Sequence, residues 1–105
     1  NGSFDTIIAT ELLEYLNDIK QALEEIHRVS KENSSIILSI PFLHPVHGDY
    51  WHDRQRLTAT KITEISEELG FTILEVIPMG SVGAVIFDIL KVSFGFNYII
   101  QLKIN

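Results

Sequence analysis

Cysteine is absent from this 105-residue sequence, which excludes disulfides, thiolate zinc sites and cysteine nucleophiles. Basic residues are also few: 8 Lys and Arg stand against 14 Asp and Glu, for a formal net charge of -6. Because proteins that bind nucleic acid need clustered Lys and Arg for the phosphates, this balance argues against that class. Long apolar runs are missing too, since Asp88, Lys91 and Lys103 interrupt the apolar segment 82–104, whereas a membrane span wants about 20 mostly apolar residues. No membrane span is predicted, and the lack of cysteine suits a cytoplasmic location.

The apolar residues that are present alternate between strand-like runs and helical spacing. Strands are predicted at residues 6–9, 36–40 and 71–77, each apolar and short. Helices are predicted over 18–29, with Asn17 as the N-cap and Asn33-Ser34 as the stop, over 59–69, ended by Gly70, and over 82–90. The segment 42–57 shows no period, contains Pro45 and Gly48, and is predicted to be a loop.

This order of elements predicts an α/β fold. Strands that alternate with helices form a parallel sheet covered by those helices, because each crossover places a helix on a face of the sheet. Three strands make a narrow sheet, so we expect further strands in the complete domain.

Six short pieces of the sequence occur in the order and spacing of a known pattern. They are Phe4-Asp5, Leu13-Glu14-Tyr15-Leu16, Glu25-Ile26-His27-Arg28-Val29, Ile36 to Pro41, His44-Pro45-Val46-His47-Gly48, and Arg56-Leu57-Thr58 followed by Gly70-Phe71. Together they resemble the C-terminal part of the class I S-adenosylmethionine-dependent methyltransferases of the type 11 family, over roughly residues 4–80. Tyr15 stands where that family more often has His, and Asn33-Ser34 stands at its Gly-Gly turn.

The resemblance implies a Rossmann-like sheet and the cofactor S-adenosylmethionine. No Gly-x-Gly-x-Gly motif occurs in the sequence, although the family carries one in its first two strands. We therefore interpret residues 1–105 as a single partial methyltransferase-like domain, the second half of the sheet, and expect the chain alone to bind the cofactor no more tightly than about millimolar. The resemblance also implies that Thr10, Glu11 and Leu12 line the cleft beside the methionine part of the cofactor. Alternatively, Glu11 begins the next helix, where a carboxylate suits the helix dipole.

The predicted loop concentrates side chains that can hold a small-molecule methyl acceptor. Three of the four histidines fall within nine residues, and loops on a rigid scaffold often carry binding groups. We predict His47 as the base that takes a proton from the acceptor, and the following residues as the substrate pocket: His44, Tyr50, Trp51, His52, Asp53 and Arg56. An arginine there could grip a carboxylate or phosphate. Alternatively, Arg56 pairs with Asp53, and Thr58 caps the following helix.

Two other classes of function remain open from the residues. The loop 44–53 contains metal-ligand types in His44, His47 and His52 with Asp49 or Asp53, although their spacing matches no helical ligand pair, and no metal is predicted. The chain could instead be a non-catalytic interaction or dimerisation fragment. The apolar helix 82–90 supports that alternative and makes a homodimer possible.

Overall fold

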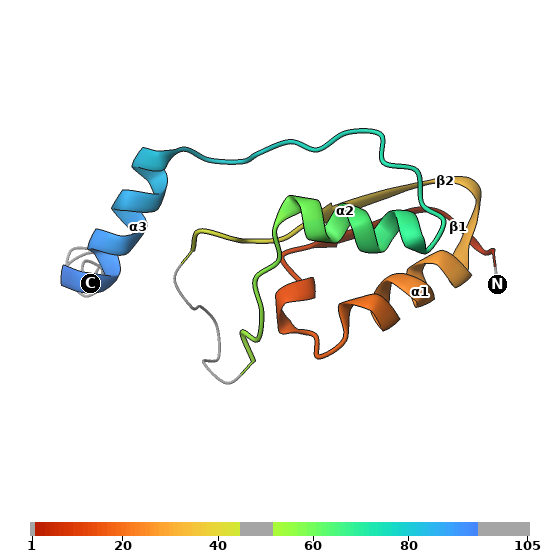
Figure 1. Ribbon diagram of the computed structural model, residues 1–105, viewed down its shortest axis with the longest axis horizontal. Helices are drawn as coiled ribbons and strands as arrows, with labels where there is room; N and C mark the ends of the chain where they lie inside the picture. Colours follow the sequence, from red (N-terminus) through yellow and green to blue (C-terminus); the bar gives the residue numbers. More distant parts are fainter. Residues whose placement is uncertain (1, 45–51, 95–105) are drawn as a thin grey trace, which may run out of the picture.

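The computed structural model describes residues 2–44 and 52–94, and in these residues it forms a small α/β unit (Figure 1). Strands β1 (Phe4–Thr10) and β2 (Ser30–Ser39) pair in parallel, with the 3-10 turn η1 (Leu13–Tyr15) and helix α1 (Ile19–Val29) between them. Helices α2 (Ala59–Glu68) and α3 (Val82–Phe94) follow. The predicted parallel α/β arrangement is confirmed at this level. None of the described helices is long and apolar enough to cross a membrane.

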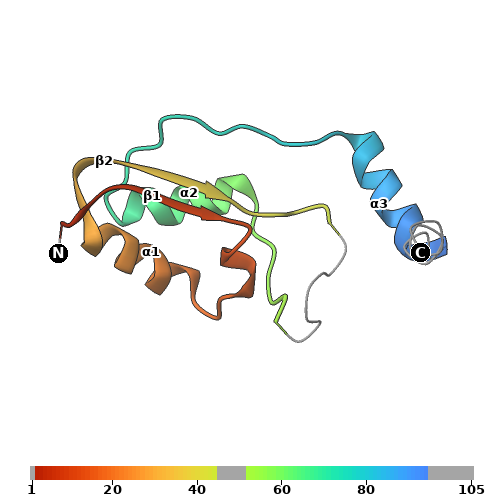
Figure 2. The same ribbon diagram turned by 180° about the vertical axis from the view of Figure 1, so that it is seen from behind.

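Helices α1 and α2 cover the same face of the sheet, as the two opposite views show (Figures 1 and 2). Register explains which side chains they cover, because side chains alternate along each strand: Ile7 pairs with Ile36 and Ala9 with Leu38, on the helix side. The intervening pair, Ile8 and Ile37, points to the other face, where the two side chains are 63% and 53% exposed. Among the described residues, the sheet therefore has one covered and one open face.

Helix α1 places one apolar stripe against the sheet. Ile19, Leu23 and Ile26 recur every three or four residues, so they share a face. The N-cap is Asp18, whose side chain accepts a hydrogen bond of 2.9 Å from the backbone N–H of Gln21. The predicted cap at Asn17 was therefore wrong by one residue.

Helix α2 completes the core next to α1, on the same face of the sheet. Thr58 caps it by accepting a 3.1 Å hydrogen bond from the N–H of Lys61, and Gly70 follows it with a φ of 93°. Both features were predicted from the sequence. The buried centre is Leu13, Ile19 and Leu23, against which the partly buried apolar residues pack: Leu16, Ala22, Ile26, Leu38, Ile40, Leu57, Ile62, Ile65, Leu69 and Phe71.

Two sequence expectations were wrong in the connections. Asn33-Ser34 does not stop the helix, since α1 ends at Val29 and both residues lie inside β2. There they form an irregularity, with Asn33 at a φ of 61° and a register shift between Phe4 and Thr6 of the partner strand. The physical reason is that the register of β2 on β1 needs extra residues, which a left-handed Asn accommodates.

The third predicted strand does not form. Residues 71–79 run without helix or strand, and the described sheet contains two strands. Apolar and β-branched residues favour an extended backbone, but a strand also needs a neighbour for its hydrogen bonds. Within the described residues this segment has no such ladder, and Leu74 is 91% exposed.

Candidate functional site

The carboxyl ends of β1 and β2 are held together by Glu11 and Ser39. The N–H of Glu11 donates to the Ser39 carbonyl oxygen at 3.0 Å and to its Oγ at 3.1 Å. The Ser39 hydroxyl in turn donates to Oε1 of Glu11 at 2.9 Å. Glu11 takes a φ of 48° at this point, so the chain turns out of the sheet instead of starting a helix there.

The turn that follows fixes Tyr15 close to the same edge. In η1 the side chains of Leu13 and Glu14 are buried, which anchors the turn in the core. Tyr15 is half-buried, and its N–H donates to the carbonyl oxygen of Leu12 at 3.1 Å. A phenol held by a buried turn has little freedom to move away from its neighbours.

Residues 54–55 of the predicted loop are docked onto this turn. The carbonyl oxygen of Glu14 accepts from the N–H groups of Arg54, at 2.8 Å, and of Gln55, at 3.2 Å. The Gln55 side chain also donates from Nε2 to the carbonyl oxygen of Leu16 at 2.5 Å. These bonds bring part of the predicted substrate loop beside the end of β1, although the two segments lie about 40 residues apart in sequence.

Charge gathers around the Tyr15 hydroxyl. Partial burial raises its pKa above the ordinary value of 10.0, and the negative charges of Glu14, Asp53 and Glu11 raise the pKa further, while Arg56 lowers it. The phenol therefore stays neutral at physiological pH and can donate a hydrogen bond. The charges of the predicted residues Glu11, Asp53 and Arg56 therefore act on a tyrosine that sequence reasoning had set aside.

Arg56 acts here as a brace. Its Nη1 donates to Oδ1 of Asp53 and, at 3.2 Å, to the carbonyl oxygen of Gln55, and its Nη2 donates to Oδ2 of Asp53 at 2.8 Å and to the carbonyl oxygen of His44 at 3.4 Å. The side chain of Asp53 is 1% exposed and that of Arg56 is 20% exposed. Hydrogen bonding to Asp53 raises the pKa of Arg56, which stays charged throughout. In this arrangement Arg56 holds the loop, as the alternative sequence interpretation had it.

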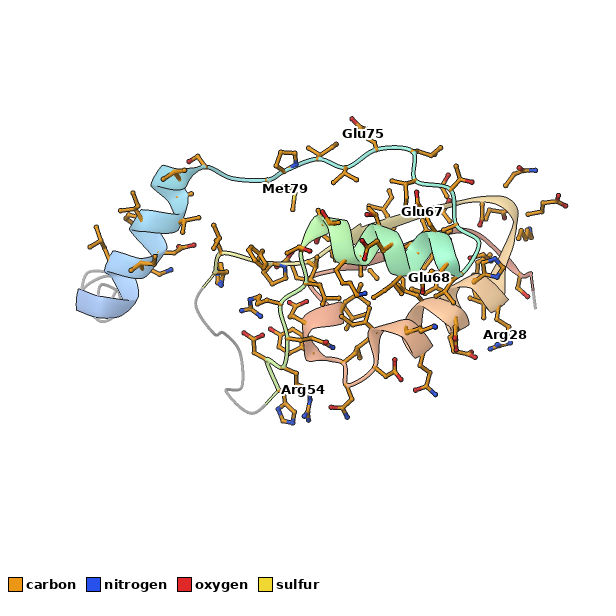
Figure 3. All side chains as sticks on the ribbon, in the orientation of Figure 1. Arg28, Arg54, Glu67, Glu68, Glu75 and Met79 are labelled. Carbon is orange, nitrogen blue, oxygen red and sulfur yellow. The ribbon has the colours of Figure 1, made fainter. Side chains whose placement is uncertain are left out.

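The other predicted site residues lie in varied places. Thr10, Leu12 and His52 are exposed, and Nε2 of His44 lies 3.7 Å from Oδ2 of Asp88 on α3. Arg54 is exposed and points away from the sheet and helices (Figure 3). His47, Tyr50 and Trp51 lie outside the described residues. In residues 2–44 and 52–94, no three His, Asp or Glu side chains gather closely enough to hold a metal ion.

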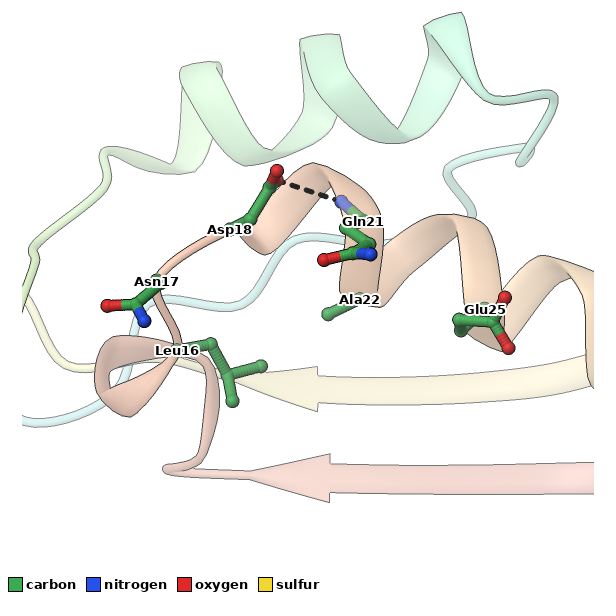
Figure 4. A pocket seen from close by; sticks show the side chains of 6 residues that line it. All are labelled: Leu16, Asn17, Asp18, Gln21, Ala22 and Glu25. Atoms are coloured by element: carbon green, nitrogen blue, oxygen red, sulfur yellow. Dashed lines mark hydrogen bonds between the residues drawn. The ribbon is translucent and has the colours of Figure 1, made fainter.

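A shallow depression of about 290 Å³ lies beside the N-terminal half of α1 and reaches Leu16, just after η1 (Figure 4). Its lining consists of Leu16, Asn17, Asp18, Gln21, Ala22 and Glu25. The Asp18 carboxylate is already used in capping α1. The depression contains none of the predicted site residues.

Comparison with known families bears on the segment that builds this edge. Residues 1–38 match the methyltransferase domain family. The predicted resemblance to a class I methyltransferase domain is thereby confirmed for β1, η1, α1 and nearly all of β2. No curated protein and no solved structure matches the chain.

Sequence reasoning missed Ser39, Glu14 and Tyr15 as parts of the candidate site. Ser39 was only the penultimate residue of a predicted strand. Glu14 and Tyr15 were read as part of a family motif, with Tyr15 counted as the loss of an imidazole. The available signal was position: polar side chains that directly follow, or end, two neighbouring parallel strands meet at one edge of the sheet.

Proposed function

We propose that this chain takes part in S-adenosylmethionine-dependent methyl transfer to a small-molecule acceptor, with the carboxyl ends of β1 and β2 facing the cofactor. One observation carries the proposal: the segment that matches the methyltransferase domain family ends at the edge where Glu11 is clasped to Ser39. In open α/β sheets, ligands lie beyond the carboxyl ends of the strands.

The donor chemistry of this edge fits one part of the cofactor. A carboxylate at Glu11, which is exposed at the strand end, suits a cationic group such as a sulfonium or an ammonium, because opposite charges attract. The described residues offer no glycine-rich cradle for the nucleoside part, and no Gly-x-Gly-x-Gly motif occurs in the 105 residues. The fit is therefore to the methionine end of the cofactor.

When bound, S-adenosylmethionine supplies an activated methyl group. The residues of this chain have to orient the methyl donor and the acceptor and shield them from water. Methyl transfer is an in-line displacement that depends mainly on positioning. The buried turn η1 and the docked residues 54–55 form a fixed wall next to the strand ends. The neutral Tyr15 hydroxyl on that wall can donate a hydrogen bond to an oxygen or nitrogen of the acceptor.

The proposal can be tested by nuclear magnetic resonance on the ¹⁵N-labelled chain. We expect S-adenosylmethionine at millimolar concentration to shift the amide signals of Thr10, Glu11, Leu12 and Ser39. The residues of the α1 depression, such as Gln21, should not respond. Affinity should be about millimolar, because the charged edge acts without the glycine cradle. Shifts confined to α1, or none at the strand ends, would contradict the proposal.

A second candidate function, self-association without catalysis, rests on the exposed apolar residues of α3. Val82, Ile86 and Phe87 are all more than half exposed. A contiguous apolar surface of this kind is typical of a contact site. Light scattering tests this candidate directly, since it requires a concentration-dependent increase in mass.

A further inference from the structure

Glu11 occupies a backbone conformation that suits another residue type. Its φ of 48° lies in the left-handed region, where Cβ crowds the following carbonyl group. Among the described residues, Asn33 is the other non-glycine residue at positive φ, and Asn tolerates this region well. Gly70 and Gly80 fill comparable positions with no Cβ. Glu11 is therefore a place where glycine would relieve strain but would remove the carboxylate.

The strained conformation is held by one residue of the neighbouring strand, Ser39. The Ser39 carbonyl oxygen and hydroxyl both accept from the Glu11 N–H, and the hydroxyl also donates to the Glu11 carboxylate, so the hydroxyl fixes the side chain while the carbonyl oxygen also holds the backbone. Strained residues persist only where their surroundings over-determine them, and such sites cluster where ligands are held. The pair spans 28 residues of sequence, so the constraint depends on the register of β1 and β2 and not on a local turn.

We propose that Ser39 is a positioning residue that fixes the Glu11 carboxylate for the sulfonium group of the ligand. The proposal rests on the proposed function and adds the group through which the edge recognises charge. Without the hydroxyl, Glu11 keeps its negative charge but loses its fixed orientation. The loss should therefore fall on ligands that carry the sulfonium charge and leave analogues with an uncharged thioether sulfur unaffected.

The ligand pair that separates these cases is S-adenosylmethionine and S-adenosylhomocysteine, which differ in the methyl group and in the sulfonium charge. Titrations followed by the amide signals of Thr10 and Leu12 give both affinities for the wild type, Ser39→Ala, Ser39→Thr and Glu11→Gln. We expect the wild type to prefer the sulfonium ligand. Ser39→Ala and Glu11→Gln should lose that preference to a similar extent, and Ser39→Thr, which keeps the hydroxyl, should retain it.

A ligand-free measurement on the same variants keeps the inference testable if Ser39→Ala folds poorly. The couplings between the α and β protons of Glu11 report its χ1 rotamer, and they should move toward rotamer averaging in Ser39→Ala but not in Ser39→Thr, whereas the bond from the Glu11 N–H to the Ser39 carbonyl oxygen still holds φ in both. Glu11→Gly should raise the melting temperature while abolishing the preference for the sulfonium ligand, because it relieves the strain and deletes the charge. A lower melting temperature for Glu11→Gly would overturn the strain argument.

The outcomes separate this inference from the proposed function. If the wild-type strand ends respond to neither ligand, the proposed function fails, and the ligand role of Ser39 fails with it. If the wild type binds there and Ser39→Ala keeps the full preference for S-adenosylmethionine, the inference alone is overturned. Equal weakening of both ligands by Ser39→Ala, or no rescue by Ser39→Thr, would also overturn it, because a merely structural role predicts those results.

Discussion

The packed unit formed by β1, α1, β2 and α2 contrasts with the stretch from Leu74 to Leu90, although both are rich in apolar residues. Leu23 is fully buried, whereas Leu74 is 91% exposed. The difference follows from the distribution of the apolar residues. Helix α1 is apolar on one side and polar on the other, so a single contact buries its apolar stripe. Helix α3 carries apolar residues nearly all round, so one neighbour cannot cover them.

The comparison is tested most strongly by deleting apolar atoms in each region. Leu23→Ala should lower the free energy of unfolding by about 2–5 kcal/mol, because it leaves a cavity at the centre of the core. Leu74→Ala should change it by less than about 0.5 kcal/mol. Denaturant unfolding monitored by circular dichroism measures both. Equal losses for the two variants would mean that the exposed stretch is part of the cooperative core.

A smaller effect is expected from the ion pairs of the packed unit. Asp53→Ala removes a buried partner of Arg56 and should cost about 1–3 kcal/mol, since the guanidinium loses its charged hydrogen bonds in a partly buried place. Glu25→Ala breaks the exposed pair with Arg28 and serves as the control, with an effect near zero. Melting temperatures of both variants give the difference. If the two lose the same stability, the Asp53–Arg56 pair is not the brace described above.

The exposed stretch should govern association more than stability. Replacing Ile86 and Phe87 together by Lys removes apolar surface from α3, and we expect the mass measured by light scattering to fall toward that of the monomer. The free energy of unfolding should change by less than about 0.5 kcal/mol. Glu75→Lys, in the connection before α3, changes charge without removing apolar surface and is the matched control (Figure 3). A wild-type chain that is monomeric at high concentration would contradict this prediction.

The smallest effect concerns alkaline pH. Because the folded-state pKa of Tyr15 lies above its ordinary value of 10.0, the phenol loses its proton more easily in the unfolded chain. Stability from this group is fully present below about pH 10 and is lost as pH rises through the folded pKa. Tyr15→Phe should therefore flatten the decline in melting temperature above pH 10 and leave the neutral range nearly unchanged. An unaltered alkaline decline would show that Tyr15 is not responsible.

Local patterns in the sequence were enough to predict the helices and strands of the packed unit. The features that they did not predict depend on pairing between segments that are distant in the sequence. The spacing of Ile19, Leu23 and Ile26 is enough to place the buried face of α1, and Thr58 and Gly70 mark the ends of α2 by their own chemistry. Residues 71–77 have the composition of a strand but form none in the described residues, because pairing depends on a neighbour that composition does not reveal.

The candidate site likewise contains contacts that the sequence predicted and contacts that only the structure reveals. The Asp53–Arg56 pair was foreseen as an alternative, in which Arg56 bridges the loop to the start of the following helix. The clasp between Glu11 and Ser39 was not foreseen, since it appears only when the register of two parallel strands is known. The surroundings of Tyr15 likewise combine β1, its following turn and a distant loop segment.

The parallel pairing of β1 and β2 also determines when this unit can assemble. Ile7 meets Ile36 across the sheet, so the strands cannot pair until the intervening chain, α1 included, has folded back. Closing such a loop costs entropy before any strand hydrogen bond repays it. Helix α1 shortens the path by winding 11 of these residues into a compact rod. We therefore expect substitutions that weaken α1 to slow folding, while the Glu11–Ser39 clasp, at the far end of the ladder, closes last and affects mainly the rate of unfolding.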